Sequence, residues 1–475
     1  MLTTVPLKSL ISNNSYYCVF MDPEPFKIKM IEKIRLLPKN ERERLIEEAG
    51  FNVFNLKIDD IFIDLLTDSG TASMSDEQWA AMLTTKQAYA GSNSFYMLEK
   101  VVKDIFGFNY FVPVHQGRPG EHILFTNTVK PGNIVPNNSH FDTTHANIKF
   151  VGGIPKDFVI EDACDTEKDL PFKGDMDIER LEDFVSRNDN IPLIMTTVTN
   201  NTVGGQPVSM KNIRKTSEVA KNYGIPFFID ACRFAENAYF IKKRESGYKH
   251  KTIKEIAREM FSYADGCTFS GKKDALTNIG GILATNDEKL FEKIRNMLVV
   301  TEGFPTYGGL ACRELAAMAV GLRESTEETY LEARCRQVEY LWKKLHDAGV
   351  PTINPPGGHA VFIDGKRFFP NIHQEQFPAQ TLAVEIYIES GVRGVELGTS
   401  CFGETDMKTR ELVKLPKLDL LRLAIPRRVY TNNHMDYVAD NVMKIFNRRD
   451  QVKGLKRVYV PPLLGHFLAK FERIR

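Results

Sequence analysis

Short apolar runs alternate with helix-like stretches between about residues 61 and 290, and this alternation constrains the fold more than any other feature. The apolar runs include residues 193–198, 226–230 and 282–285, and the helix-like stretches include 210–223 and 253–261. Strands that alternate with helices predict an α/β protein with a mostly parallel sheet covered on both faces. Because ligands of such sheets bind beyond the carboxyl ends of the strands, we look for a site in the segments that follow them.

The length of the chain, 475 residues, is too great for one simple core and predicts two domains. After Gly309 the pattern changes to a long helical run from Glu314 to His346, where we expect a smaller α/β domain. Near the N-terminus, four apolar residues recur at helical spacing and predict a helix: Phe26, Met30, Ile31 and Ile34. We expect an N-terminal extension (1–21), a segment packing with the small domain (22–65), a large domain (66–312) and a small C-terminal domain (313–475).

The composition excludes several classes of protein. The net charge is +1, from 62 basic and 61 acidic residues, so nothing favours nucleic acid or an anionic membrane as a partner. The seven cysteines are scattered and form no Cys-x-x-Cys pair, which argues against a disulfide framework or a structural zinc site. No apolar run approaches the roughly 20 residues that span a bilayer. The opening residues lack the apolar core of a signal peptide, so a cytoplasmic location is expected.

Two adjacent lysines, Lys272 and Lys273, lie in the glycine-flanked segment 270–281, just before an apolar run. A lysine amine that is partly desolvated and close to other cations becomes nucleophilic near neutral pH, and it can then bind an aldehyde cofactor. The alternative is a solvated charged pair, which is common on protein surfaces. The choice between the two depends on what the rest of the chain places nearby.

Asp230 closes the predicted strand 226–230, so its carboxylate should project into the ligand crevice. A pyridine cofactor needs an acidic partner that keeps its ring nitrogen protonated, because protonation makes the ring an electron sink. A helix cap is the alternative role for such a carboxylate. Arg233 follows one turn later and could reach the same ligand, or could instead pair with Glu236.

Three further segments carry side chains suited to a phosphorylated, flat ligand. Segment 115–121 places glycine and Arg118 before a predicted helix, which suits phosphate binding by backbone N–H groups and a guanidinium. Segment 200–207 offers amides that can donate to a phenolic oxygen, although Asn and Gly-Gly also form ordinary turns. Phe141 could stack on a ring, or could be a core residue.

Taken in this order, the motifs resemble the β-eliminating lyases, the family of tryptophanase and tyrosine phenol-lyase. The similarity runs from about residue 23 almost to the C-terminus and includes further matching segments: 66–71, 88–92, 204–209, 236–240, 304–309, 377–380 and 425–427. The resemblance implies a pyridoxal 5′-phosphate (PLP)-dependent transferase type I fold, an amino-acid substrate and a homotetramer with shared active sites.

The resemblance also implies a role for individual residues. Lys273 would bind the aldehyde of the cofactor, with Lys272 beside it. The other cofactor-binding residues would be Gln116, Gly117, Arg118 and Ser270 at the phosphate, Phe141 on the ring face, Asn201 and Arg233 near the phenolic oxygen, and Asp230 at the ring nitrogen. The substrate carboxylate would be bound by Arg427, Thr67 and Ser69.

Tyr89 would protonate the leaving group in this family, and could do so across a subunit interface. Gly70 and Asn278 fall where backbone carbonyls bind potassium, but Gln87 replaces the acidic residue that the family places beside the cation. Pro119 replaces a small residue after Arg118, so one N–H group is lost and Arg118 is expected to adopt extended geometry.

Three positions favour tryptophan over tyrosine as the substrate. The sequence has Asp142 after the stacking Phe, Leu397 where the phenol-cleaving branch has arginine, and His466 where that branch has Phe. A carboxylate and an imidazole suit an indole whose N–H must be held while its ring carbon is protonated. Cleavage of tyrosine or of another aromatic or S-linked amino acid is the nearest alternative. A non-catalytic PLP-binding relative and another type I enzyme, such as an aldolase or aminotransferase, are more remote.

Overall fold

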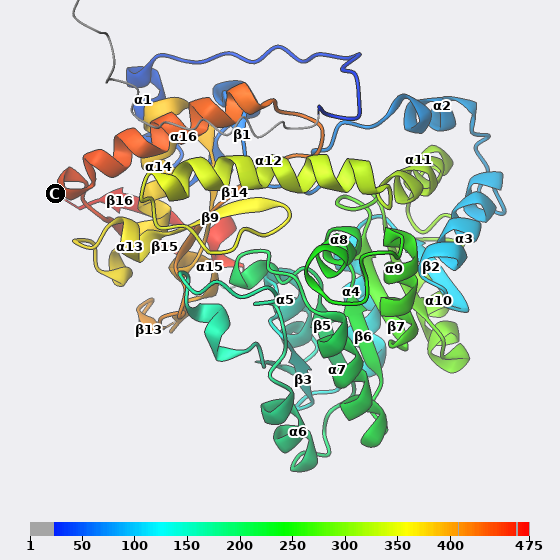
Figure 1. The fold of residues 1–475 in the computed structure, drawn as a ribbon. Coiled ribbons are helices and arrows are strands. Elements are labelled where there is room, and N and C mark those ends of the chain that lie inside the picture. The colour runs from blue at the N-terminus through cyan, green and yellow to red at the C-terminus, as the bar shows by residue number, and fades with distance from the viewer. Residues whose placement is uncertain (1–22, 407, 462–463, 475) are drawn as a thin grey trace, which may run out of the picture.

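The computed structural model describes residues 23–406, 408–461 and 464–474, which form a mixed α/β protein (Figure 1). The expected extension 1–21 therefore lies outside the described residues. The main sheet has the order β2-β8-β7-β6-β5, with β2 (Tyr110–Val114), β5 (Ile194–Thr197), β6 (Phe227–Asp230), β7 (Gly266–Ser270) and β8 (Gly281–Thr285). Only β8 runs opposite to the other four strands. The predicted mostly parallel sheet is confirmed.

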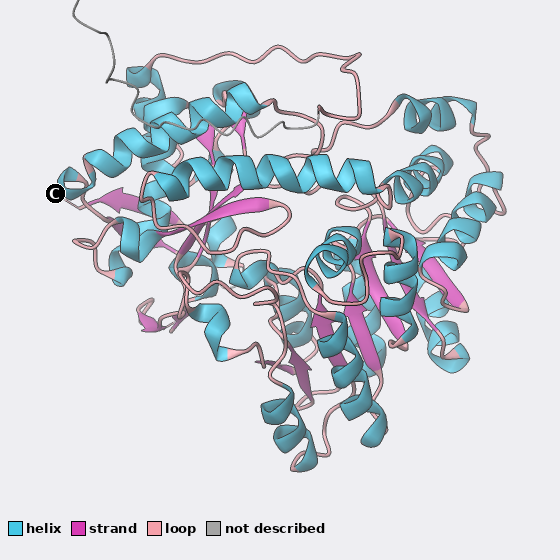
Figure 2. Ribbon diagram, in the orientation of Figure 1, coloured by secondary structure: helices cyan, strands magenta, loops and turns pink. Residues whose placement is uncertain are grey.

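Helices cover both faces of this sheet, and every residue of β5, β6, β7 and β8 is therefore buried (Figure 2). Side chains alternate between the two faces along a strand. Phe227 and Ile229 of β6 accordingly join one apolar cluster, whereas Phe228 joins another on the opposite face. The first cluster takes in α3 (Asn93–Ile105), α7 (Met210–Asn222), α8 (Phe234–Arg244) and α9 (Ile253–Ser262). The second takes in α4 (Gly117–Thr128), α5 (Asp142–Phe150) and α10 (Glu288–Thr301).

A second region, at the upper left of Figure 1, is built on the antiparallel sheet β11-β14-β9. Its strands are β9 (Ala360–Asp364), β11 (Val395–Leu397) and β14 (Leu420–Ala424), and its helices are α13 (Gly365–Phe368), α14 (Pro378–Ser390), α15 (Thr399–Phe402) and α16 (Asn432–Asn447). The early elements α1 (Lys39–Glu48) and β1 (Ile63–Asp64) belong to it, since β1 pairs with β10 (Val392–Arg393). One apolar cluster joins Ile46 and Leu65 to Leu423 and Phe471.

The remaining elements are peripheral to these two sheets. They are α2 (Asp76–Thr84), α6 (Ile178–Ser186), β3 (Ile134–Asn137), β4 (Ile154–Asp157), β12 (Glu404–Thr405), β13 (Leu412–Lys414), β15 (Leu455–Tyr459) and β16 (Lys470–Arg473). The expected domain boundaries remain a prediction. No helix in the described part of the chain is both long and apolar enough to cross a bilayer.

Two sequence expectations were wrong in detail. The run from Glu314 to His346 is two helices, α11 (Cys312–Glu324) and α12 (Glu328–Asp347), separated by a turn in which Ser325 caps α11 through its Oγ bond to Leu322 O. The break lets α11 pack against α2 and α3 while α12 crosses between the two apolar clusters (Figure 1).

The predicted N-terminal helix is also absent from the described residues, since residues 23–38 contain no helix. Met30 is 75% exposed and Ile31 is 83% exposed, so this apolar stripe meets no core within the described chain. A short helix gains most of its stability from packing of its apolar face, and that packing is missing here.

Candidate active site

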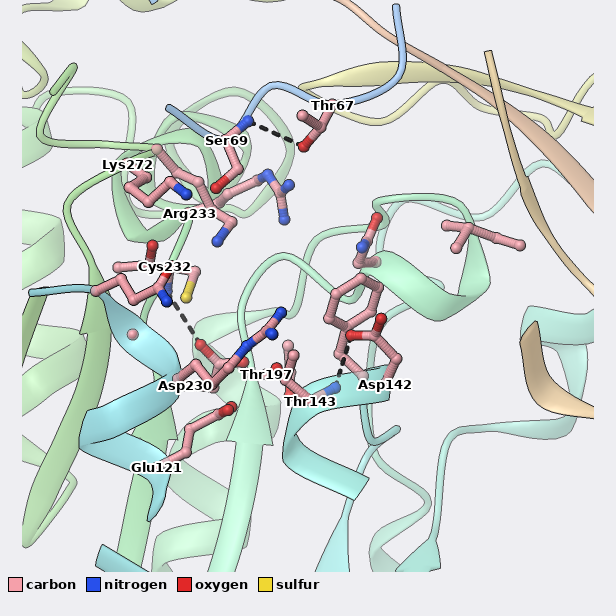
Figure 3. A pocket seen from close by; sticks show the side chains of 18 of the residues that line it. Thr67, Ser69, Glu121, Asp142, Thr143, Thr197, Asp230, Cys232, Arg233 and Lys272 are labelled. Atoms are coloured by element: carbon pink, nitrogen blue, oxygen red, sulfur yellow. Dashed lines mark hydrogen bonds between the residues drawn. The ribbon is translucent and has the colours of Figure 1, made fainter. Parts of the chain in front are cut away.

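A cavity of about 290 Å³ lies at the carboxyl ends of β5, β6 and β7, between the two regions of the chain (Figure 3). This volume is close to the lower end of the range for small-molecule sites. The structure brings together most of the residues singled out from the sequence, which line this cavity: Thr67, Ser69, Gln116, Gly117, Arg118, Phe141, Asp142, Asn201, Asp230, Arg233, Ser270, Lys272, Lys273, Leu397 and His466.

The paired lysines lie on a hydrogen-bonded turn that leaves β7. Lys273 N donates to Ser270 O at 3.2 Å, and Gly271 N donates to Gly280 O at 2.8 Å. Burial lowers the pKa of Lys272, and the neighbouring charges of Lys273 and Arg118 lower it further. The turn is therefore a partly desolvated, cation-rich setting, which is the condition that makes a lysine amine nucleophilic.

The N-terminus of α4 faces the same turn and suits a phosphate group. A Cβ atom on Gly117 would lie 2.9 Å from Ser270 Cβ, so only glycine allows this close approach of backbone to Ser270. Backbone N–H groups at a helix N-terminus and the Arg118 guanidinium both favour an anion. The expected extended geometry of Arg118 was wrong, because Arg118 and Pro119 both lie in the first turn of α4. Proline is tolerated there, since that N–H has no partner within the helix.

The neighbouring strand ends carry the acid and amide expected around a pyridine ring. Asp230 ends β6, and its Oδ1 accepts a hydrogen bond from Cys232 N at 3.3 Å (Figure 3). Asn201 Oδ1 contacts His359 Nε2 at 2.9 Å, which leaves the amide nitrogen of Asn201 to donate to a ligand. The buried hydroxyls of Thr199 and Thr268 also line the cavity without a hydrogen-bond partner among the described atoms. Unpaired buried polar groups of this kind are consistent with a bound polar cofactor.

Arg233 and Arg427 are held in a buried ionic cluster around Asp68. Arg233 binds both oxygens of Asp68, at 3.0 and 2.6 Å, and not Glu236. Arg427 is fully buried and contacts Asp68 at 2.9 Å, Glu236 at 2.8 Å and Asp274 at 3.0 Å. Burial raises the pKa of Asp68, but the charges of Arg233 and Arg427 outweigh it and hold that pKa well below its ordinary value.

Arg427 therefore departs from its expected place, because it does not line the cavity. A buried guanidinium has to be neutralised by nearby carboxylates, and Arg427 has three of them. To bind a substrate carboxylate it would have to exchange one of these partners. Its role in substrate binding remains a prediction.

Tyr89 also lies outside the cavity of its own chain. Its side chain is 74% exposed and packs edge-on against Tyr307, with ring centroids 5.3 Å apart. Tyr307 raises the pKa of Tyr89 through a side-chain hydrogen bond and its charge. Any catalytic role for Tyr89 would require a second copy of the chain, so that role stays a prediction.

The two residues expected to bind potassium, Gly70 and Asn278, are hydrogen-bonded to each other. Asn278 Nδ2 donates to the backbone carbonyl of Gly70 at 3.0 Å. The side-chain oxygen of Gln87 accepts a hydrogen bond from Cys312 N at 3.1 Å. Potassium binding by Gly70 and Asn278 remains a prediction.

The end of the cavity away from the lysines combines one polar pair with an apolar wall. His466, in the short 3₁₀ helix η7 (Gly465–Phe467), places Nε2 3.2 Å from Asp142 Oδ2. Asp142 is the first residue of α5, and its other oxygen accepts from Thr143 N at 2.6 Å. Leu397 and Phe467 line the same cavity. The pair can hold a polar N–H of a ring whose remaining surface meets apolar side chains.

The sequence analysis missed two charged residues of the cavity. Glu121, in α4, accepts a hydrogen bond from Thr144 Oγ1. Arg422 is the one charged residue of the buried strand β14. The signal for Arg422 was present, since a charge within an apolar strand needs a partner or a ligand. Glu121 lay inside the segment 115–121 that was assigned to phosphate. Phe54 also lines the cavity, and no sequence signal distinguished it.

Replacing Glu121 by glutamine is expected to flatten the pH dependence of stability in the cofactor-free chain. Burial raises the pKa of Glu121 from 4.5 to about 7, and the charge of Asp230 adds to the rise. The folded state then binds this proton more tightly than the unfolded state, so the free energy of unfolding falls as the pH rises from 4.5 to about 7. Glutamine does not titrate. In Glu121→Gln, the decrease in the free energy of unfolding over this pH range should therefore be smaller by up to about 3 kcal/mol. Denaturant unfolding across this window tests the change, with the exposed Glu182→Gln as control; equal slopes in both variants would contradict it.

Comparisons with known proteins agree with this geometry. A serine palmitoyltransferase from S. paucimobilis, solved with bound PLP, superposes with a TM-score of 0.58 at 13% identity and covers 87% of this chain and 97% of its own. The serine palmitoyltransferase of Sphingomonas wittichii gives a TM-score of 0.57 at 14% identity, with the same coverage. The fold is that of the type I PLP-dependent enzymes.

The family model for β-eliminating lyases matches residues 64–441. A tyrosine phenol-lyase of Fusobacterium nucleatum is 51% identical over 450 residues, 94% of this chain and 97% of that protein. A tryptophanase of Hyphomonas neptunium is 49% identical over 453 residues, 95% of this chain and 99% of that protein. This chain belongs to the β-eliminating lyase family and is a PLP-dependent enzyme.

Proposed function

We propose that this enzyme cleaves L-tryptophan to indole, pyruvate and ammonium. The observation that carries the proposal is the Asp142–His466 pair, 3.2 Å apart, in a cavity whose wall at position 397 is leucine. A phenol oxygen placed against Leu397 would lose a hydrogen bond, at a cost of roughly 1–3 kcal/mol. An indole ring would instead bury its carbon atoms against this wall and present its N–H to the polar pair.

The cofactor would be held by residues of this chain at both of its ends. Its phosphate fits the N-terminus of α4 with Ser270, and its ring fits between Phe141 and the strand end that carries Asp230. When bound, PLP supplies an electron sink for the negative charge that develops at the substrate α-carbon. Asp230 would keep the ring nitrogen protonated, and Asn201 would donate to the phenolic oxygen.

The proton transfers would be made by side chains. The Lys273 amine would remove the α-proton of the substrate, since it lies on the cavity wall in the cation-rich turn. Asp142 and His466 would hold the indole N–H while the ring carbon receives a proton. Tyr89 of a second subunit would supply that proton, in a homotetramer. The aminoacrylate that leaves would hydrolyse to pyruvate and ammonium.

Tyrosine is the second candidate substrate, and one observation favours it. Arg422 lines the cavity on the strand next to that of Leu397, and its Nε has no hydrogen-bond partner among the described atoms. Burial lowers its pKa to about 10, and the guanidinium could bind a phenol oxygen. Several relatives, including that of Fusobacterium nucleatum, are named tyrosine phenol-lyases.

The deciding experiment incubates the purified protein and PLP with L-tryptophan or L-tyrosine and follows pyruvate, indole and phenol together. Equal release of indole and pyruvate from tryptophan would support the proposal. Release of phenol from tyrosine without indole from tryptophan would overturn it in favour of the second candidate. S-alkyl-cysteine serves as a third substrate, because its thiolate leaves without ring protonation.

Replacing His466 by phenylalanine is expected to lower kcat for indole release about a hundredfold, because the partner of Asp142 at the ring end is lost. The visible absorption of bound PLP and the rate with S-alkyl-cysteine should change little, since His466 lies away from the lysine turn. His250→Phe replaces an exposed histidine and serves as control. Indole release that is unchanged in His466→Phe would remove His466 from the proposed mechanism.

A further inference from the structure

Asp142 and His466 have a third potential metal ligand beside them, the thiol of Cys401 in α15. The three residues come from three distant segments of the chain, so their spacing in the sequence does not predict a metal site. One ligand atom from each lies within 4.8 Å of the others. A tetrahedral zinc ion, with bonds of about 2.0–2.3 Å to oxygen, nitrogen and sulfur, needs its ligands roughly 3.3–3.8 Å apart. The Asp142–His466 distance of 3.2 Å is close to this range, and the Cys401 sulfur lies within 4.8 Å of a ligand atom of each of the two residues.

The surroundings leave the side chains of Asp142, Cys401 and His466 available to bind a metal ion. Asp142 and His466 are 7% and 6% exposed. His466 Nδ1 is buried without a hydrogen-bond partner among the described atoms, and the polar neighbour of the ring is Asp142 Oδ2 at Nε2. The backbone of Cys401 is fixed, since its N–H donates to Glu396 Oε2 at 3.1 Å.

We propose that Asp142, Cys401 and His466 form a binding site for a borderline or soft divalent cation such as Zn²⁺, and that occupancy inhibits the enzyme. Thiolate and imidazole select such ions over Mg²⁺ or Ca²⁺, which prefer oxygen. The Cys401 thiol would bind as thiolate, so metal binding releases its proton to solvent. The ion would occupy the ring end of the cavity and engage both residues assigned to the substrate ring.

Metal binding is tested directly on untagged holoenzyme that has been stripped with a chelator and dialysed. Equilibrium dialysis against Zn²⁺ should give one bound ion per chain, and Cys401→Ala should weaken this binding at least about tenfold. Cys164→Ala, which removes a thiol elsewhere, should leave it unchanged. X-ray absorption of the bound zinc should show one sulfur neighbour that is lost in Cys401→Ala. Equal affinity in Cys401→Ala and the unaltered chain would overturn the proposal.

Inhibition is the second readout, and this part rests on the proposed function. Zn²⁺ should lower the lyase rate of the unaltered enzyme and of Cys164→Ala at concentrations that leave Cys401→Ala active, and a chelator should restore the rate. Without Zn²⁺, Cys401→Ala should retain its basal rate. If zinc binds as expected but neither tryptophan nor tyrosine is cleaved, the proposed function fails and the metal site stands. If the enzyme is active but binds no zinc, only the metal site fails.

Discussion

Lys273→Ala should lower the rate of pyruvate release roughly 10⁴-fold, the upper end of what one positioned proton-transfer group contributes. Lys273 lies on the turn after β7, in the cavity that also holds Asp230 and the N-terminus of α4. Alanine removes the amine that we propose both binds the cofactor aldehyde and takes the α-proton. The phosphate contacts remain, so the variant should still bind PLP, but without a covalent link.

Two measurements separate this result from a general loss of structure. Borohydride reduction followed by mass spectrometry should fix the cofactor to the peptide that contains Lys273 in the unaltered enzyme, and to no peptide in the variant. Lys272→Ala is the matched control, because Lys272 lines the same cavity from the same turn. A loss that was as large in Lys272→Ala, with the covalent link retained in Lys273→Ala, would show that the two lysines have been assigned in the wrong order.

The second large effect is expected for Asp230→Ala, with kcat lowered roughly 10³-fold, as for loss of one preorganised electrostatic contact to a developing charge. Asp230 is 5% exposed and ends β6 at the cavity wall. If Asp230 holds the ring nitrogen as proposed, removing its carboxylate would cost that nitrogen its proton and weaken the electron sink at the α-carbon. KM should change less than kcat, because Asp230 makes no predicted contact with the substrate.

Asp230→Glu provides the matched comparison, since it keeps the charge and moves it by one methylene group. We expect it to recover part of the lost rate, whereas Asp230→Asn should not. Cofactor binding is followed separately by dialysis, so that weak PLP binding is not mistaken for slow chemistry. Full activity in Asp230→Asn at saturating PLP would exclude an ionic role for this residue.

The alternating pattern of apolar runs and helices was enough to predict the parallel sheet, because burial of both faces requires continuous apolar strands. Strand ends were located to within one or two residues: 193–198 is β5 and 226–230 is β6. The break in the helical run after Gly309 was harder to predict, because Ser325 and Glu327 are both compatible with a helix. Only the packing of α11 and α12 against two different apolar clusters imposes the turn. For Phe26 to Ile34 the helical spacing was present, but the packing that stabilises a short helix was not.

The sequence by itself determined the α/β class, the family and the identity of most residues that line the cavity, because strand ends and glycine-rich turns are local features with local chemistry. Only the tertiary structure decided which side chains neutralise one another. Arg427 is enclosed by Asp68, Glu236 and Asp274, and Cys401 lies beside Asp142 and His466. The Arg427 pairings join residues separated by more than 150 positions, and both clusters depend on how distant segments of the chain pack, which no local pattern encodes.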